Sequence, residues 1–215
     1  MKVNLELLGE ILCKTSEGGS FPSSKTPFEV LYTEEGFENA RTWFRGKCHA
    51  EEEDHGARIA MNENQFINFL RKLTDFNDYE ILEILDIFDK HQNGSIAFEE
   101  FFLILSMLSA REFGQATQFL YLHGRQVFEI LCHSITTRIN FERFARLGFV
   151  MGIPEEYILM RLLDYNLNTF HTFDREEFIL YYFDILTHLD DFRKKTNRRE
   201  GEDGADSKGG KCLLC

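Results

Sequence analysis

The chain has 215 residues, enough for one large domain or two small lobes with a hydrophobic core. Hydrophobic residues make up 43% and aromatic residues 14%, which excludes a mainly disordered chain, and the formal charge of −12 argues against nucleic-acid binding, which needs a basic surface. The five cysteines are odd in number, lack the spacing of a disulfide scaffold and follow no secretory signal, so we expect a reduced, cytoplasmic setting.

The N-terminal segment, residues 1–33, is predicted to hold a helix followed by a linker. The sequence MKVNLELLGEILCK has apolar residues at helical spacing, interrupted by Asn4, Glu6 and Glu10. It therefore predicts an amphipathic helix and not a signal or membrane-spanning segment. Residues 14–28 are rich in Gly, Ser and Pro, which is typical of a linker.

From about Glu34 a unit recurs four times: an amphipathic helix, a polar loop, one apolar or β-branched residue, and a second helix that begins with Phe. A lone helix–loop–helix unit cannot bury its apolar face, so we expect the units to pair. The repeat predicts an all-α protein with two lobes, residues 34–110 and 115–187. The stretch from Ser109 to Thr117 would connect them.

The second unit contains the most informative stretch, DKHQNGSIAFEE, residues 89–100. It begins with Asp89 and ends with Glu100, and Gly94 stands where the loop must turn sharply. Calcium takes six to eight hard oxygens, and a long final carboxylate can bind it through both oxygens. The order of residues is therefore typical of a calcium loop. We also expect Ile96 to pair with a partner loop in a short two-stranded contact.

The other three loops depart from this pattern. The first unit ends its loop with the neutral Gln65 and the third with the cation Arg143, which argues against a metal in either loop. In the fourth unit, an apolar Phe173 and the final carboxylate arrive two residues late. Because irregular loops can bind calcium, this unit remains a candidate for a weak second site, formed by Asp164, Asn166, Asn168 and Glu177.

These residues resemble the EF-hand superfamily, from about Glu34 to Leu186. Within it, QFLYLHGRQVFEIL (118–131), with the RINFERF and LGF that follow, is similar to the EF-hand subunit of the sperm-flagellar calcium-channel complex. The closer resemblance implies a cilium or flagellum as the location. The superfamily resemblance implies calcium as the cofactor, held by the side chains of Asp89, His91, Asn93 and Glu100 and by the carbonyl of Ser95.

The affinity expected of this ligand set is weak. Only Asp89 and Glu100 supply carboxylates, His91 offers nitrogen to a cation that prefers oxygen, and Ala97 can offer only a bound water. Fewer charged ligands mean weaker binding, so we expect a Kd of ~10⁻⁵ M or weaker.

The C-terminal segment, residues 188–215, is predicted to be a disordered tail, because a basic run, an acidic patch and a Gly-rich spacer follow the last amphipathic helix. It ends in Cys212-Leu213-Leu214-Cys215, which fits the prenylation motif C-a-a-X except that Cys is not among the usual final residues. We predict lipidation of Cys212. With the basic run as a second signal, the tail would bind the cytoplasmic face of a membrane.

The sequence has no phosphate loop, nucleophile elbow or dinucleotide-binding glycine pattern, so we expect no enzymatic activity. The leading hypothesis is a calcium-binding EF-hand sensor that binds a protein target, either an amphipathic helix or a channel or ciliary component. The alternative is a structural EF-hand-like adaptor that binds its partner without calcium.

Overall fold

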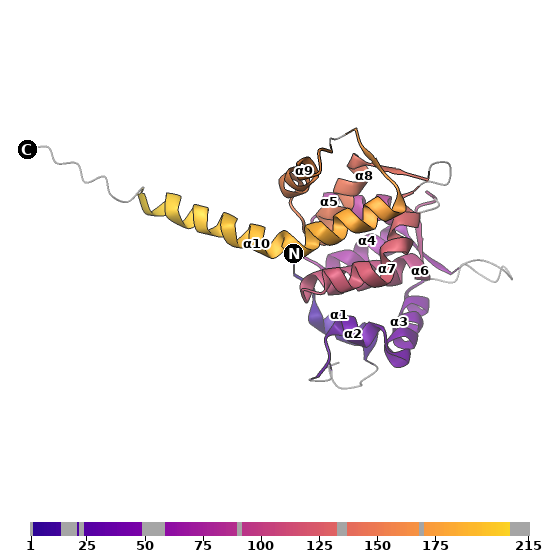
Figure 1. Ribbon diagram of the computed structural model, residues 1–215. Helices are drawn as coiled ribbons and strands as arrows, with labels where there is room; N and C mark the ends of the chain where they lie inside the picture. Colours follow the sequence, from indigo (N-terminus) through magenta and orange to yellow (C-terminus); the bar gives the residue numbers. More distant parts are fainter. Residues whose placement is uncertain are drawn as a thin grey trace, which may run out of the picture.

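The structure is a computed structural model that describes residues 2–13, 21, 24–48, 59–89, 92–132, 137–167 and 170–206, with side chains up to residue 194. These residues form ten helices and two pairs of short antiparallel strands (Figure 1). The prediction of an all-α protein is confirmed.

The N-terminal segment packs directly onto the first half of the chain. Helix α1 (Leu5–Leu12) begins at the cap residue Asn4 and buries Leu8, Ile11 and Leu12. It packs against α3 (Glu34–Lys47) and α4 (Glu63–Leu73). The N–H of Asn4 also donates to the carbonyl of Leu73 at 2.7 Å. The N-terminal helix is therefore part of the same packed body.

Helix α2 (Pro27–Leu31) begins inside the segment predicted to be a linker. Thr26 caps it, because the Thr26 hydroxyl accepts from the N–H of Glu29 while the Glu29 carboxylate accepts from the N–H of Thr26. Phe28 and Leu31 are fully buried. The linker prediction is wrong for Pro27 and Phe28: the composition suggested a loop, but Pro suits the first turn of a helix.

The first pair of units is joined by a two-stranded contact between β1 (Ala60–Asn62) and β2 (Ser95–Ala97). Strand β1 leads into α4; α5 (Asp78–Phe88) precedes β2, and α6 (Phe98–Glu112) follows it. Met61 pairs with Ile96, so the predicted contact of Ile96 with a partner loop is confirmed.

The second pair of units repeats this arrangement. Its elements are α7 (Ala116–Leu131), β3 (Ile139–Asn140), α8 (Phe141–Met151), α9 (Glu155–Asp164), β4 (Thr172–Phe173) and α10 (Arg175–Asp206). Strand β3 pairs antiparallel with β4, with Ile139 opposite Phe173.

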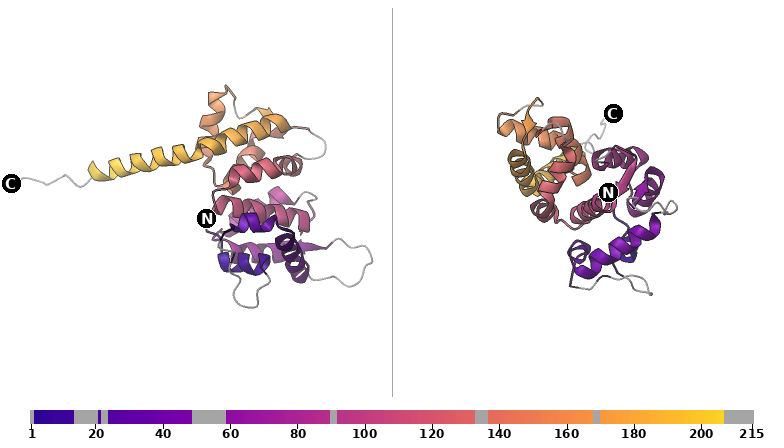
Figure 2. Two further views of the ribbon diagram at one scale, coloured as in Figure 1. Left: turned by 60° about the horizontal axis from the view of Figure 1, so that its bottom comes forward. Right: turned by 90° about the vertical axis from the view of Figure 1, so that its right-hand side faces the viewer.

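One apolar core runs through both pairs of units. Its buried side chains extend from Val3 to Leu189. Helix α6 packs on α7 and α8, and α5 also packs on both, while only residues 113–115 separate α6 from α7 along the chain. The two halves therefore lie against each other with no spacer between them (Figure 2).

Helix α10 continues to Asp206, through part of the segment in which we expected a disordered tail from residue 188. Three contacts support its continuation: Leu189 is buried, the Phe192 ring stacks on Tyr157 at 4.4 Å, and Arg193 Nη2 donates to the Gly152 carbonyl at 2.9 Å. Beyond them the helix leads away from the body (Figure 1). Its side chains from residue 195 and the predicted lipidation residue Cys212 lie outside the described part of the chain.

Candidate functional site

The loop predicted to bind calcium folds around the carboxylate of Asp89. Asp89 caps the C-terminus of α5 and is only 8% exposed. Its Oδ1 accepts from the N–H of Asn93 at 3.3 Å, and its Oδ2 accepts from the N–H of Gly94 at 2.7 Å. Gly94 has a φ of 69°, the left-handed region in which a β carbon is strained. The sharp turn therefore lies at the predicted glycine.

Asn93 and Glu100, two further ligand candidates of this loop, also accept hydrogen bonds from the protein. Asn93 Oδ1 accepts from the N–H of Ser95 at 3.0 Å and from its hydroxyl at 2.6 Å. Glu100 is 5% exposed, and its Oε2 accepts from the N–H of Ala97 at 2.8 Å. This bond caps the first turn of α6. His91 lies outside the described residues.

The donor set fits calcium in part. Hydrogen bonds bring Asp89, Asn93 and Ser95 together in one loop, and all three can offer oxygen. Glu100 caps its own helix, so its side chain must turn to become a ligand. Within the described ranges, no group of three His, Cys, Asp or Glu side chains lies close enough to hold a metal.

The residues of the weaker candidate site interact with different arginines. Asp164, at the end of α9, accepts from Arg161 at 2.8 Å, whereas Glu177, in the first turn of α10, accepts from Arg138 at 2.7 Å. Asn166 has a φ of 57° and lies just past the end of α9. Asn168 is outside the described residues. Calcium binding by this set stays a prediction.

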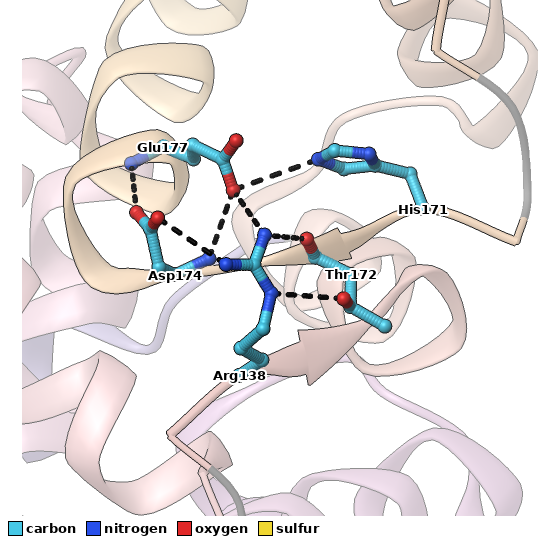
Figure 3. A network of polar contacts seen from close by, with 5 residues as sticks. All are labelled: Arg138, His171, Thr172, Asp174 and Glu177. Atoms are coloured by element: carbon cyan, nitrogen blue, oxygen red, sulfur yellow. Dashed lines mark hydrogen bonds and ion pairs between the residues drawn. The ribbon is translucent and has the colours of Figure 1, made fainter.

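Arg138 forms a polar network that the sequence did not reveal (Figure 3). Its guanidinium donates to Thr172 Oγ1 at 2.9 Å, to the Thr172 carbonyl and to Glu177 Oε2, and it pairs with Asp174 Oδ2 at 3.4 Å. Nε2 of His171 lies 3.6 Å from the same Glu177 oxygen. A basic residue directly before the apolar position of the third loop was a usable signal, because pairing of the loops places it beside the acidic start of α10.

The two loops without a final carboxylate are closed by side-chain donors. Gln65 Nε2 donates to the carbonyl of Lys47 at 3.0 Å, and Arg143 Nη1 donates to the carbonyl of Leu131 at 2.6 Å. Lys47 and Leu131 are the last residues of α3 and α7, the helices that enter these loops. In both units a direct hydrogen bond joins the entering helix to the exiting one.

A groove of about 490 Å³ lies between α3, α6 and α7. Its apolar wall includes Phe37, Phe98 and Phe102, whose ring centroids lie 5.1 to 6.0 Å apart. Its polar lining consists of Arg41, Glu99, Glu100, His123, Gln126 and Glu129. Because α3 and α6 belong to the first half and α7 to the second, the groove lies where the two halves meet.

A histidine–tyrosine pair joins the two halves beside this groove. The Tyr32 hydroxyl, just past α2, lies 2.6 Å from His123 Nε2 on α7, and the two rings stack at 5.4 Å. The Gln126 amide oxygen accepts from Nδ1, so a neutral His123 accepts the Tyr32 proton at Nε2. Burial lowers the pKa of His123 and raises the pKa of Tyr32 to about 12, which favours this neutral pair.

No protein-family model matches the sequence. None of the described helices combines the length and the apolar composition needed to cross a membrane.

Proposed function

We propose that this chain is an EF-hand-like protein that binds a protein target in the groove between α3, α6 and α7, and that the loop from Asp89 to Glu100 makes this binding responsive to calcium. One observation carries the proposal. Glu100 is at once the last residue of the loop, the cap of α6 and part of the groove wall. A change in what its carboxylate binds therefore acts directly on the groove.

The residues that would hold calcium are Asp89, His91, Asn93 and Glu100, with the Ser95 carbonyl; of these, His91 lies outside the described residues. When bound, the ion supplies a divalent charge that the carboxylates of Asp89 and Glu100 share. If the Glu100 side chain turns into the loop to bind the ion, it releases the N–H of Ala97 and the first turn of α6 loses its cap. Phe98 and Phe102 lie in the first turns of α6 and line the groove, so its apolar wall changes with that turn.

Calorimetric titration of the wild type and of Glu100→Gln with calcium tests this function. We expect one site with a Kd of ~10⁻⁵ M or weaker, lost in Glu100→Gln. Glu99→Gln is the matched control, because the neighbouring Glu99 is exposed and should leave the heat signal intact. The single tryptophan, Trp43, stacks on Phe101 of α6 at 5.9 Å, so its fluorescence reports movement of that helix.

A calcium-independent adaptor is the second candidate function. It is favoured by the hydrogen bonds that Asp89, Asn93 and Glu100 accept from the loop and from α6, since these bonds fix the loop through groups of the protein itself. For this candidate we expect no heat signal from either protein, and target binding that is equal with calcium and with a chelator. A calcium signal that depends on Glu100 excludes it.

The proposed location is the cytoplasmic face of a membrane, reached through lipidation of Cys212, with a cilium or flagellum as the compartment that the closer resemblance implies. The support is the C-terminal sequence alone. Replacement of Cys212 by Ser should move the protein from membrane to soluble fractions. Unchanged partitioning would show that the C-terminus is not the anchor.

A further inference from the structure

Two carboxylates meet at the start of α10. The N–H of Asp174 donates to Glu177 Oε2 at 3.0 Å, and the N–H of Glu177 donates to Asp174 Oδ1 at 2.9 Å. This exchange fixes the first turn of the helix, but it also holds two like charges in one place. A cation beside them lowers the free energy of the arrangement.

The cation that the structure places there is a side chain from the neighbouring loop. Arg138 lies one residue before β3, and Thr172 begins β4, the strand paired with β3. All three guanidinium nitrogens are engaged: Nε with the Thr172 hydroxyl, Nη1 with Asp174, and Nη2 with Glu177 and the Thr172 carbonyl (Figure 3). One side chain thus joins the third loop to both carboxylates of the fourth.

We propose that the guanidinium of Arg138 is a built-in cation for the second pair of loops, which neutralises Asp174 and Glu177 and ties the two loops together without a metal ion. A planar guanidinium suits this role, because its fork of N–H donors reaches several acceptors at once in directions that a point charge does not select. The second pair of loops is then held in one arrangement whether calcium is present or absent. This inference does not depend on calcium binding by the Asp89 loop.

The chemical consequence is a site that becomes cation-dependent when the arginine is removed. Without Arg138, Asp174 and Glu177 remain beside each other and beside the Thr172 carbonyl, and these oxygens suit a hard divalent cation. A cation that binds only the folded protein stabilises it in proportion to its concentration relative to the Kd.

The experiment is thermal unfolding in a Glu100→Gln background, which removes the response proposed for the Asp89 loop. The proteins compared are this parent, the parent with Arg138→Ala, and the parent with Arg138→Ala and Glu177→Gln, each in chelator and in excess calcium. In chelator, Arg138→Ala should lower the unfolding midpoint by about 3 to 6 °C. Calcium should then raise the midpoint of Arg138→Ala by about 2 °C or more and leave the other two proteins unchanged.

Two further variants keep the result interpretable. Arg138→Gln is neutral but can still donate to Thr172, so it provides the test if Arg138→Ala does not fold, and it should also gain stability from calcium. Arg138→Lys keeps the positive charge and should not respond. If the neutral variants gain no more from calcium than the parent does, or if Arg138→Lys gains as much as they do, Arg138 is an ordinary ion-pair partner and the proposal fails. The Glu100→Gln background keeps this outcome separate from the calorimetric test of the Asp89 loop.

Discussion

The two pairs of loops are connected in the same way but differ in the partners of their carboxylates. In each pair a short antiparallel contact joins the loops, and the first loop is closed by a side-chain donor, Gln65 or Arg143, bonded to the carbonyl at the end of the entering helix. In the second loop of the first pair, Asp89 and Glu100 accept hydrogen bonds from backbone N–H groups. In the second pair, Asp174 and Glu177 have in addition the guanidinium of Arg138.

In the second pair, the contacts of Arg138 join the two loops to each other. A guanidinium on a paired loop neutralises the carboxylates permanently, so their arrangement no longer varies with ion concentration. In the first pair, Asp89 and Glu100 have backbone N–H groups among their partners, and such bonds can be exchanged for bonds to a cation. We therefore propose the responsive role for the first pair and the rigid role for the second.

The largest expected effect tests whether the two pairs of units unfold together as one cooperative unit. Phe144 is fully buried on α8, with its ring 4.3 Å from both Phe173 and Tyr182. Phe144→Ala should destabilise the protein by about 3–5 kcal/mol, because it removes a large core side chain and leaves a cavity. Chemical denaturation followed by far-UV circular dichroism measures the loss.

The same denaturation, followed by Trp43 fluorescence, asks whether the first half loses stability as well. Trp43 lies in α3, and α5 and α6 pack on α7 and α8 through a shared core, so the two probes should shift together. A Trp43 transition that stays at its wild-type midpoint would mean that the halves unfold separately. Phe170→Ala is the control: this ring is 90% exposed, and its loss should change stability by less than about 0.5 kcal/mol.

A smaller effect is expected at the donors that close the first loop of each pair. Arg143→Ala removes the bond to the Leu131 carbonyl and should cost about 1–2 kcal/mol, and Gln65→Ala, which removes a neutral donor to Lys47, about 1 kcal/mol. Equilibrium denaturation in urea measures both.

The exchange variant Arg143→Gln sharpens this comparison. It places in the third unit the donor type that the first unit uses, so it should recover part of the stability lost in Arg143→Ala. Glu142→Ala, an exposed neighbour, is the control and should be nearly neutral. If Arg143→Gln loses as much stability as Arg143→Ala, a glutamine donor cannot replace the arginine donor in the third unit.

The smallest expected effect is a pH dependence at the boundary between the halves. Burial lowers the pKa of His123 in the folded protein, so near and below pH 6.5 the unfolded chain binds more protons at this residue than the folded one. Its contribution to stability is therefore complete well above pH 6.5 and decreases as the pH falls towards the folded-state pKa. Arg41, Glu99 and Glu129, which line the same groove, set the charge around it.

Urea denaturation of the wild type and of His123→Gln at a series of pH values measures this term. The stability of His123→Gln should fall less than that of the wild type as the pH is lowered through 6.5. His188→Gln serves as the comparison, because His188 is 52% exposed on α10 and contacts Asp184, so its replacement should leave the contribution of His123 in place. Identical pH profiles for the wild type and His123→Gln would show that His123 does not contribute to the pH dependence of stability.

Local signals in the sequence predicted much of the fold. The repeat of helix, loop and helix predicted from about Glu34 corresponds to α3 and the helices that follow it, and Gly94 marks the left-handed turn. The contact of Ile96 was also predicted, because a repeated unit requires a partner. The continuation of α10 beyond residue 188 was missed, since it depends on Phe192 packing against Tyr157, a partner 35 positions earlier (192 − 157).

The sequence by itself determined the helical units and the order of oxygen-bearing residues from Asp89 to Glu100. It also determined that Gln65 and Arg143 stand where a final carboxylate would be. Each of these features depends on neighbours within a few residues. Only the tertiary structure decided how the charges are used. Glu100 forms part of a groove completed by α7, and the carboxylates at the start of α10 receive Arg138 from another loop. Electrostatic pairing acts through space, so residues far apart in the sequence decide which partners these carboxylates have.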